Sequence, residues 1–253
     1  MKSDELEELV RGCLDDFYRR RLQKLNDLRL ADTLKKKNPY LFRAIGMEKA
    51  SDIVERLLQA FMSSSEETIF GDAFFEPIVK AVCSGVAAGG AGVDVVVETQ
   101  DDYTVISVKS GPNWGNSSQV AKLRDDFMTA SRVFANKKLK KQFRALLGHC
   151  YGRKCGQPSS RCMYTTKSGQ AFWEEITGDS EFYLKLIRAM RDHPRANRVV
   201  YDKAWSSAVN RFTKEFLDGF SKSDGSIDWE KLVRFNSGKD PMSLTHSRSS
   251  KRS

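Results

Sequence analysis

The chain has 253 residues, of which 40% are hydrophobic and 30% charged, and these shares are typical of a soluble globular protein. Lysine and arginine outnumber aspartate and glutamate by 42 to 33, and the net charge of +9 favours a polyanionic partner. No apolar run approaches the roughly 18 residues of a membrane span, and the start MKSDELEEL lacks the apolar core of a signal peptide, so we expect a cytoplasmic protein without membrane attachment.

The N-terminal part of the chain has the apolar spacing of helices. Residues 4–30 place leucine and valine at helical intervals among charges and predict one long amphipathic helix. The segment NPYLFRA predicts a connecting loop, because Pro39 disfavours helical backbone at Asn38. A second helix is predicted over residues 48–62.

The next segments change from helical to strand patterns. SSSEETIFGDAFFEPIVKAVC predicts a helix with a serine cap and early glutamates, which ends near Cys83 and kinks at Pro77. A loop of small residues is predicted from Gly85 to Gly92. VDVVVE (93–98) and YTVISVK (103–109) are β-branched runs separated by TQDD, and together they predict a hairpin.

The remaining elements complete a fold of the α/β (α+β) class. A helix is predicted over 117–136, a third strand over 143–151 and a short fourth strand near 161–165. The order helix, strand, strand, helix, strand predicts a central mixed β-sheet flanked by helices. Later helices are predicted at QAFWEEI, 181–192, 199–222 and 227–235. The predicted organisation is an N-terminal helical region at 1–62, a core at 63–168, a C-terminal helical region at 169–237 and a basic disordered tail at 238–253.

Asp94, Ser107 and Lys109 are the candidate catalytic residues. Strand side chains alternate, so Ser107 and Lys109 share one face, and a turn between Gln100 and Asp101 sets Asp94 opposite Ser107. An acid and a lysine on adjacent strands suit phosphodiester hydrolysis, in which the carboxylate holds Mg²⁺ and the lysine orients or deprotonates water. The alternative is a buried ion pair between Asp94 and Lys109, or a lysine that extends its charged end to solvent from the end of a strand, in either case without a catalytic role.

Several motifs resemble a known nuclease family. Asp94 followed by Ser107-Val108-Lys109 resembles the motif of the PD-(D/E)XK nucleases. NPYLFRA, SSSEETIFGDAFFEP, VKSGPNWGNSSQ, FWEEITG and DGSIDWEKLVRFNS are similar to the PmeII-like type II restriction endonucleases over residues 30–237. The resemblance implies a restriction-endonuclease-like core and a sequence-specific, Mg²⁺-dependent endonuclease acting on double-stranded DNA. It also implies a homodimer that matches a palindromic site, and a DNA methyltransferase that protects host DNA.

The resemblance assigns the metal-binding acid to Asp94 and the lysine role to Lys109. Two positions depart from the family motif. Val93 stands where proline is usual, which has little consequence because that proline is not catalytic. Ser107 stands where aspartate or glutamate is usual, and a serine is a poor metal ligand beside a carboxylate.

A second acid is therefore expected from a helix. Glu76 is the first candidate, because a helix glutamate that reaches the metal is a recurrent feature of the family. Asp125 or Asp126, on the helix after Lys109, is the second candidate. Glu67 is a third candidate, although a place in a first helical turn also explains it.

The loop GPNWGNSSQ and later basic residues are candidates for DNA contacts, because such side chains reach phosphates and base edges. The candidates are Asn113, Trp114, Asn116, Gln119, Lys122, Arg124, Arg153 and Lys154. The alternative for the loop is a helix cap by Ser117 or Ser118 and a half-buried tryptophan.

Two other functions remain open. One is a repair or junction nuclease of the same fold, which cuts by DNA structure instead of sequence. The other is a catalytically inactive DNA-binding protein, for which Ser107 is the best argument.

Overall fold

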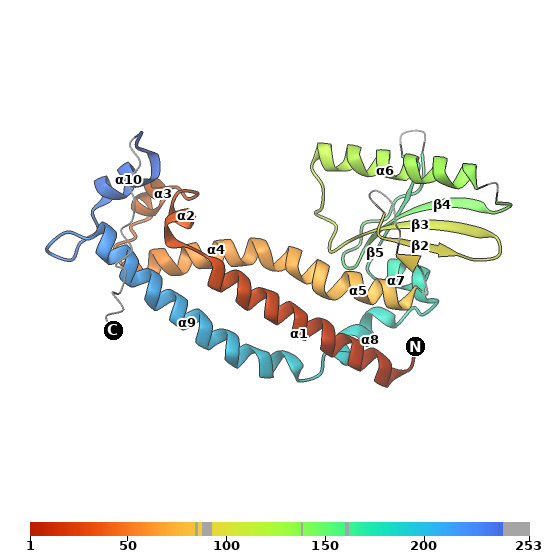
Figure 1. Ribbon diagram of the computed structural model, residues 1–253, viewed down its shortest axis with the longest axis horizontal. Helices are drawn as coiled ribbons and strands as arrows, with labels where there is room; N and C mark the ends of the chain where they lie inside the picture. Colours follow the sequence, from red (N-terminus) through yellow and green to blue (C-terminus); the bar gives the residue numbers. More distant parts are fainter. Residues whose placement is uncertain (84–85, 88–92, 138, 160–161, 240–253) are drawn as a thin grey trace, which may run out of the picture. The chain divides into compact units, whose positions relative to one another are not determined.

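The computed structural model describes residues 1–83, 86–87, 93–137, 139–159 and 162–239 (Figure 1). Most of the predicted loop at 85–92 and residues 240–253 of the predicted tail lie outside the described residues. Within the described part, no helix combines the length and the apolar character that a bilayer crossing requires.

The chain forms two compact units, each assembled from separate stretches of sequence. The first unit consists of Met1–Phe17 and Glu67–Arg195, and the second of Tyr18–Glu66 and the chain from Ala196 onward. Three helices contribute residues to both units: α1 (Ser3–Asp27), α4 (Ala50–Phe70) and α9 (His193–Phe220).

A five-stranded mixed sheet forms the centre of the first unit, in the order β1-β2-β3-β4-β5. The strands are β1 (Val86–Ala87), β2 (Val95–Glu98), β3 (Asp102–Lys109), β4 (Gln142–His149) and β5 (Thr165–Ser168). The pairs β1-β2 and β2-β3 are antiparallel, whereas β3-β4 and β4-β5 are parallel. The predicted fold class, a central mixed sheet flanked by helices, is confirmed.

Helices cover the two faces of this sheet (Figure 1). On one face, α6 (Ser117–Asn136) packs Leu123 and Phe127 against Val105 and Leu147. The other face is covered by apolar side chains of α1, the π-helix η1 (Gly71–Phe75), α5 (Glu76–Val82), α7 (Gln170–Thr177) and α8 (Phe182–Ala189). Strand alternation explains this division, because Val105 and Ile106 point to opposite faces.

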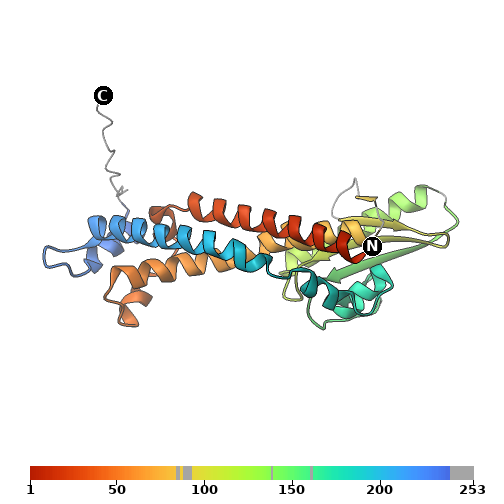
Figure 2. The ribbon, with the colours of Figure 1, turned by 90° about the horizontal axis from the view of Figure 1, so that it is seen from below.

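The second unit is helical, with α2 (Leu30–Leu34), α3 (Pro39–Ala44) and α10 (Trp229–Ser237) beside parts of α1, α4 and α9. Figures 1 and 2 both show those three long helices side by side. Leu25 from α1, Leu57 from α4 and Phe212 from α9 belong to one buried cluster, which is the core of this unit.

The predicted loop NPYLFRA is wrong, because this segment contains helix α3. Asn38 is the N-cap, and its side chain accepts a hydrogen bond from the Leu41 backbone N–H at 3.2 Å. Pro39 occupies the first turn, where its missing N–H leaves no helical bond unmade. The restriction that proline places on the preceding residue applies only to Asn38, which is extended as an N-cap requires.

The predicted serine cap before residue 67 is also wrong, because α4 continues through SSSEET without a break. The Ser64 and Ser65 hydroxyls donate to the Phe61 carbonyl at 3.1 and 3.0 Å, which satisfies them inside the helix. Glu67 therefore lies in the last turn of α4, and capping does not explain it.

Two strands also differ from the prediction. The fourth predicted strand, at 161–165, begins only at Thr165, where β5 pairs with β4. The short strand β1 lies within the stretch predicted as a loop of small residues. By contrast, α6 has the predicted bounds.

Candidate active site

The hairpin of β2 and β3 has the register that the sequence predicts. Val95 pairs with Ile106 and Glu98 with Tyr103, so the turn falls between Gln100 and Asp101. Continued by one residue, this register sets Asp94 beside Ser107.

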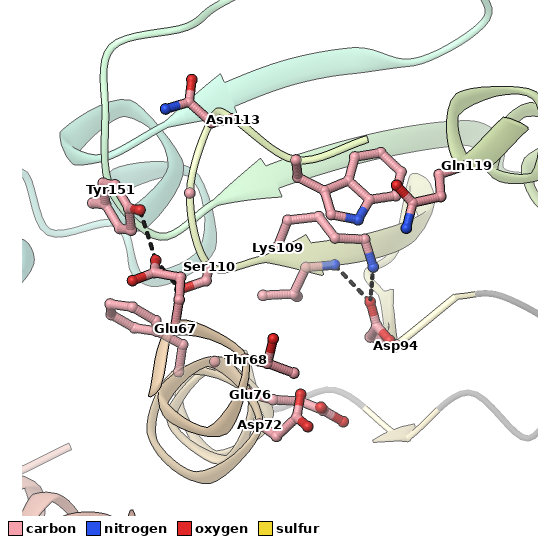
Figure 3. A pocket seen from close by; sticks show the side chains of 15 residues that line it. Glu67, Thr68, Asp72, Glu76, Asp94, Lys109, Ser110, Asn113, Gln119 and Tyr151 are labelled. Carbon is pink, nitrogen blue, oxygen red and sulfur yellow. Dashed lines mark hydrogen bonds and ion pairs between the residues drawn. The ribbon is translucent and has the colours of Figure 1, made fainter. Parts of the chain in front are cut away.

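One oxygen of Asp94 is surrounded by donors (Figure 3). Asp94 Oδ2 accepts a hydrogen bond from the Val108 backbone N–H at 2.6 Å and from the Ser107 hydroxyl at 3.3 Å. Lys109 Nζ lies 3.9 Å from the same oxygen. Among the described residues none donates to Oδ1, so the carboxylate is fixed through one oxygen. The bonds to Oδ2 are charge-assisted and hold the orientation of Asp94.

Asp94 and Lys109 line a cavity of about 480 Å³. Three further carboxylates line it, from Glu67, Asp72 and Glu76. Figure 3 shows these three on one helical segment, across the cavity from Lys109. Lys109 is the only lysine or arginine among the described residues that line the cavity, so one cation faces four acids.

The helical segment that carries the three acids contains a π-turn. Pro77 has no N–H for a helical bond to the carbonyl four residues earlier. Just before it, the Glu76 N–H donates to the Gly71 carbonyl, five residues back, and the predicted kink takes the form of η1. Glu67 lies in the last turn of α4, Asp72 in η1 and Glu76 at the start of α5, and all three line the cavity. Asp72 is a site residue that was not predicted from the sequence.

Glu67 is held at the wall of the cavity. Its Oε1 accepts hydrogen bonds from the Ser110 hydroxyl at 3.1 Å and from the Tyr151 hydroxyl at 2.6 Å. The hydrogen bond to Glu67, and secondly burial, raise the pKa of Tyr151. Gly111 admits the tyrosine ring, since a Cβ at this position would lie 2.2 Å from it. The sequence analysis did not identify Tyr151, which follows β4 and is 40 residues from Gly111 in the chain.

The other predicted acids have different surroundings. Glu76 forms an ion pair with Lys80, one helical turn later, at 2.5 Å. Asp126 pairs with Lys122 at 3.5 Å. Neither Asp125 nor Asp126 is among the described residues that line the cavity. Asp126 follows the cavity residue Gln119 by seven positions, which is about 10 Å along a helix axis.

The structure brings only part of the predicted DNA-binding set to the cavity, namely Asn113, Trp114 and Gln119. Asn116 is the N-cap of α6, and its side-chain oxygen accepts from the Gln119 N–H at 3.0 Å. The Gln119 side chain accepts from the Asn116 N–H at 3.0 Å and completes a capping box. The cap predicted at Ser117 or Ser118 is therefore wrong by one or two residues.

The basic members of the predicted set lie away from the cavity. Lys122 and Arg124 are exposed on α6, and Lys154 is exposed after β4. Arg153 lines a different cavity, which it shares with Tyr151.

His149 is a buried neighbour of the candidate site that the sequence analysis assigned no catalytic role. It pairs with Lys109 in the parallel register of β3 and β4, so the two side chains share a face. Its Nδ1 lies 3.0 Å from the Ser168 hydroxyl, which donates to the Lys154 carbonyl. Since that hydroxyl hydrogen is used, Nδ1 of a neutral His149 carries the proton and donates it. Burial, then the charges of Lys154 and Lys109, lower the pKa of His149 to about 4.

The donor chemistry of the cavity fits Mg²⁺. No three histidine, cysteine or acidic side chains in the described ranges converge closely enough to enclose a metal ion. Mg²⁺ prefers oxygen ligands, and proteins usually hold it through one or two carboxylates together with waters and substrate phosphates. Asp94 and Glu76 in the open cavity supply such carboxylates.

Comparison with known proteins identifies one family. The family model described as type II restriction endonuclease EcoO109I matches residues 4–198, which is more than half of the chain and includes every residue of the cavity. No curated protein matches the chain. The match supports the predicted type II restriction endonuclease family but not the PmeII-like group in particular.

Proposed function

The chain belongs to the family of type II restriction endonuclease EcoO109I, and from this premise we propose that it cuts double-stranded DNA at a specific sequence with Mg²⁺. The family makes it a nuclease, and DNA is the substrate that the family implies. The single observation that supports catalysis by this chain is the 3.9 Å approach of Lys109 to Asp94 in a cavity lined by acids.

Each residue of the cavity has a proposed role. Asp94 and Glu76 would hold Mg²⁺, and a bound Mg²⁺ would supply Lewis-acid polarisation of the scissile phosphate and offset its negative charge. Lys109 donates to the attacking water or to a phosphate oxygen and stabilises the charge that develops there. Ser107 is fully buried and bonded to Asp94, so it orients that carboxylate and does not bind metal.

DNA binding is proposed for polar residues of the cavity and for basic residues outside it. Asn113 and Gln119 line it, and their amides suit phosphate or base-edge contacts. The amide nitrogen of Asn116 remains for such a contact, because its oxygen caps α6. The exposed cations proposed for phosphate contacts are Lys122, Arg124, Arg153 and Lys154.

The proposal also covers the oligomeric state, the genetic partner and the location of the protein. A homodimer would match the two-fold symmetry of a palindromic site. A DNA methyltransferase encoded nearby would protect host DNA, and both proteins would act in the cytoplasm. A closer relation to the PmeII-like group rests on the quoted motifs and remains a prediction.

A catalytically inactive DNA-binding protein is the second candidate, and Ser107 favours it. Nuclease sites of this superfamily usually carry an acid at that position, and this chain has a buried hydroxyl. The two candidates share DNA binding and differ in cleavage, so a cleavage assay separates them.

The test is incubation of the purified protein with plasmid and phage DNA in Mg²⁺. We expect discrete, reproducible fragments, and we expect Lys109→Ala to abolish cutting while DNA binding is kept, because the substitution removes the only cation of the described cavity lining. Lys203→Ala, at an exposed lysine of α9, is the matched control and should cut normally.

Other results of the cleavage assay would support a different function. Binding without cleavage by the unaltered protein would favour the inactive DNA-binding protein. Cleavage confined to branched DNA would favour a structure-specific nuclease. Full activity of Lys109→Ala would contradict the proposed role of the lysine.

A further inference from the structure

Trp114 lies against the proposed catalytic lysine. It belongs to the loop between β3 and α6, and the centroid of its ring is 5.1 Å from Lys109 Nζ. The indole is half-buried and packs against the cluster under α6 that contains Leu123 and Phe127. One part of the ring therefore rests on the core, while another meets an ammonium group at a distance where cation–π attraction operates.

The loop around Trp114 is tightly constrained. Gly115 has φ +96°, in the left-handed region, and a Cβ there would lie 3.1 Å from Val120. The capping box of Asn116 and Gln119 then fixes the first turn of α6. The strand end at Lys109 and the helix start at Asn116 therefore hold the loop at both sides of Trp114.

Lys109 has few other contacts to hold it. Its Nζ lies 3.9 Å from Asp94, which is too long for a hydrogen bond. No oxygen of the described residues accepts a hydrogen bond from this nitrogen. A lysine side chain has four rotatable bonds and adopts many rotamers unless something restrains it. The Trp114 ring is a neighbour besides Asp94 that favours one position of the ammonium.

We propose that Trp114 is a positioning residue whose ring holds the Lys109 ammonium beside Asp94. This inference rests on the proposed function of the cavity. It gives Trp114 a role in the rate of cleavage, in place of the DNA contact expected from the sequence. The feature that matters is the electron-rich ring face, so another aromatic residue should replace tryptophan better than an aliphatic one.

The first test compares Trp114→Leu with Trp114→Phe. Single-turnover cleavage is measured on a DNA that the unaltered enzyme cuts, and affinity for the same DNA is measured with Ca²⁺ in place of Mg²⁺. We expect the leucine variant to cut roughly 5- to 30-fold more slowly, the phenylalanine variant to keep most of the rate, and the affinity of both to be unchanged. A loss of affinity as large as the loss of rate would overturn the proposal and make Trp114 a DNA contact.

A second test keeps the shape of the side chain. Fluorinated tryptophans weaken the negative ring face, so the cleavage rate should fall stepwise as fluorine atoms are added. Trp114→Phe is the control, because it retains the other three of the four tryptophans and should show no such fall. A rate independent of fluorination in the unaltered sequence would overturn the proposal, even if Trp114→Leu fails to fold.

A spectroscopic measurement separates failure of this inference from failure of the proposed function. A ring beside Lys109 shifts the NMR signals of its Cε protons upfield, and Lys109→Arg identifies those signals. We expect the shift in the unaltered protein and its loss in Trp114→Leu, whether or not DNA is cut. A protein that shows the shift but cuts no DNA would overturn the endonuclease proposal, and with it the effect of Trp114 on rate. An unshifted signal in an active enzyme would overturn the positioning role alone.

Discussion

Ser107 is completely buried and donates its hydroxyl hydrogen to Asp94 at 3.3 Å. A carboxylate at this position would place a second negative charge beside Asp94, and without a cation between them that arrangement is unfavourable. A serine hydroxyl instead adds no charge and donates a hydrogen bond to Asp94. The second acid is therefore expected on the helical wall of the cavity, which Glu76 lines.

Substitutions test which of the candidate acids binds the metal together with Asp94. Glu76→Gln should raise the Mg²⁺ concentration needed for cleavage by roughly 10- to 100-fold, because it removes a carboxylate from the cavity. The double substitution Asp125→Asn with Asp126→Asn is the matched control and should have little effect, since neither acid is among the described residues that line the cavity. The measurement is the cleavage rate over a series of Mg²⁺ concentrations. A larger loss in the double variant would place the second acid on α6.

His149 makes the stability of the protein depend on pH. Its folded-state pKa of about 4 lies below the ordinary 6.5, so between these values the unfolded chain binds a proton that the folded chain does not. The stabilisation is present above pH 6.5 and is lost as the pH falls toward 4, by about 1–3 kcal/mol.

Urea unfolding at pH 7 and pH 4.5 measures this loss. His149→Gln keeps an amide donor for Ser168 but does not titrate, so its unfolding free energy should fall less between the two values. Carboxylates titrate in both proteins, and the difference between them isolates the histidine. Equal losses in the two proteins would contradict the assignment.

At the scale of elements, some helices and strands follow from short-range sequence patterns, whereas the form of others depends on long-range packing. The hairpin register and the bounds of α6 follow from periodicity, because each depends on residues close in the chain. By contrast, the π-turn that the helix forms before Pro77 depends on packing. Phe74, within the π-turn, is buried and stacks on Phe70, just before it, with ring centroids 4.6 Å apart. A proline in the sequence predicts where a helix kinks, but it does not predict which aromatic side chains pack at the kink.

The helix α3 was predicted as a loop although its sequence contains a helix start. Asn-Pro indicates a boundary, and the sequence analysis treated this boundary as a loop. The same pair also begins a helix, with asparagine as N-cap and proline in the first turn. Phe42 is 5% exposed and packs into the core of the second unit, which supplies the stabilisation that a six-residue helix lacks by itself.

At the scale of the whole molecule, the compact units combine distant segments. Val10 on α1 packs in the cluster that contains Ile78 and Phe172, while Leu25 on the same helix packs in the cluster that contains Phe212. One periodic helix thus belongs to two cores. A division into consecutive segments, 1–62, 63–168 and 169–237, remains a prediction about domains, since amphipathic spacing does not say which partner covers the apolar side.

The net charge of +9 predicts DNA binding that weakens steeply with salt, because each phosphate contact by lysine or arginine releases a counterion. Arg153→Ser with Lys154→Ser should reduce the slope of log affinity against log salt by about 2, equally for all DNA sequences. The measurement is DNA affinity over a range of salt concentrations, without Mg²⁺.

Lys49→Ser with Lys203→Ser is the matched control for charge, since both lysines are exposed in the second unit. It should leave the slope unchanged. An equal reduction by both pairs would show that affinity comes from the total charge and not from the loop after β4.

The alignment of Asp94, Ser107 and Lys109 follows from the amino-acid sequence alone. It needs only strand alternation and a four-residue connection, and all the residues involved lie within 16 positions of one another. The surroundings of this alignment depend on the folded chain. Glu67 and Tyr151 are 84 residues apart and meet because the last turn of α4 and the end of β4 converge on one cavity. Such contacts arise from packing between distant segments, and local periodicity carries no information about them.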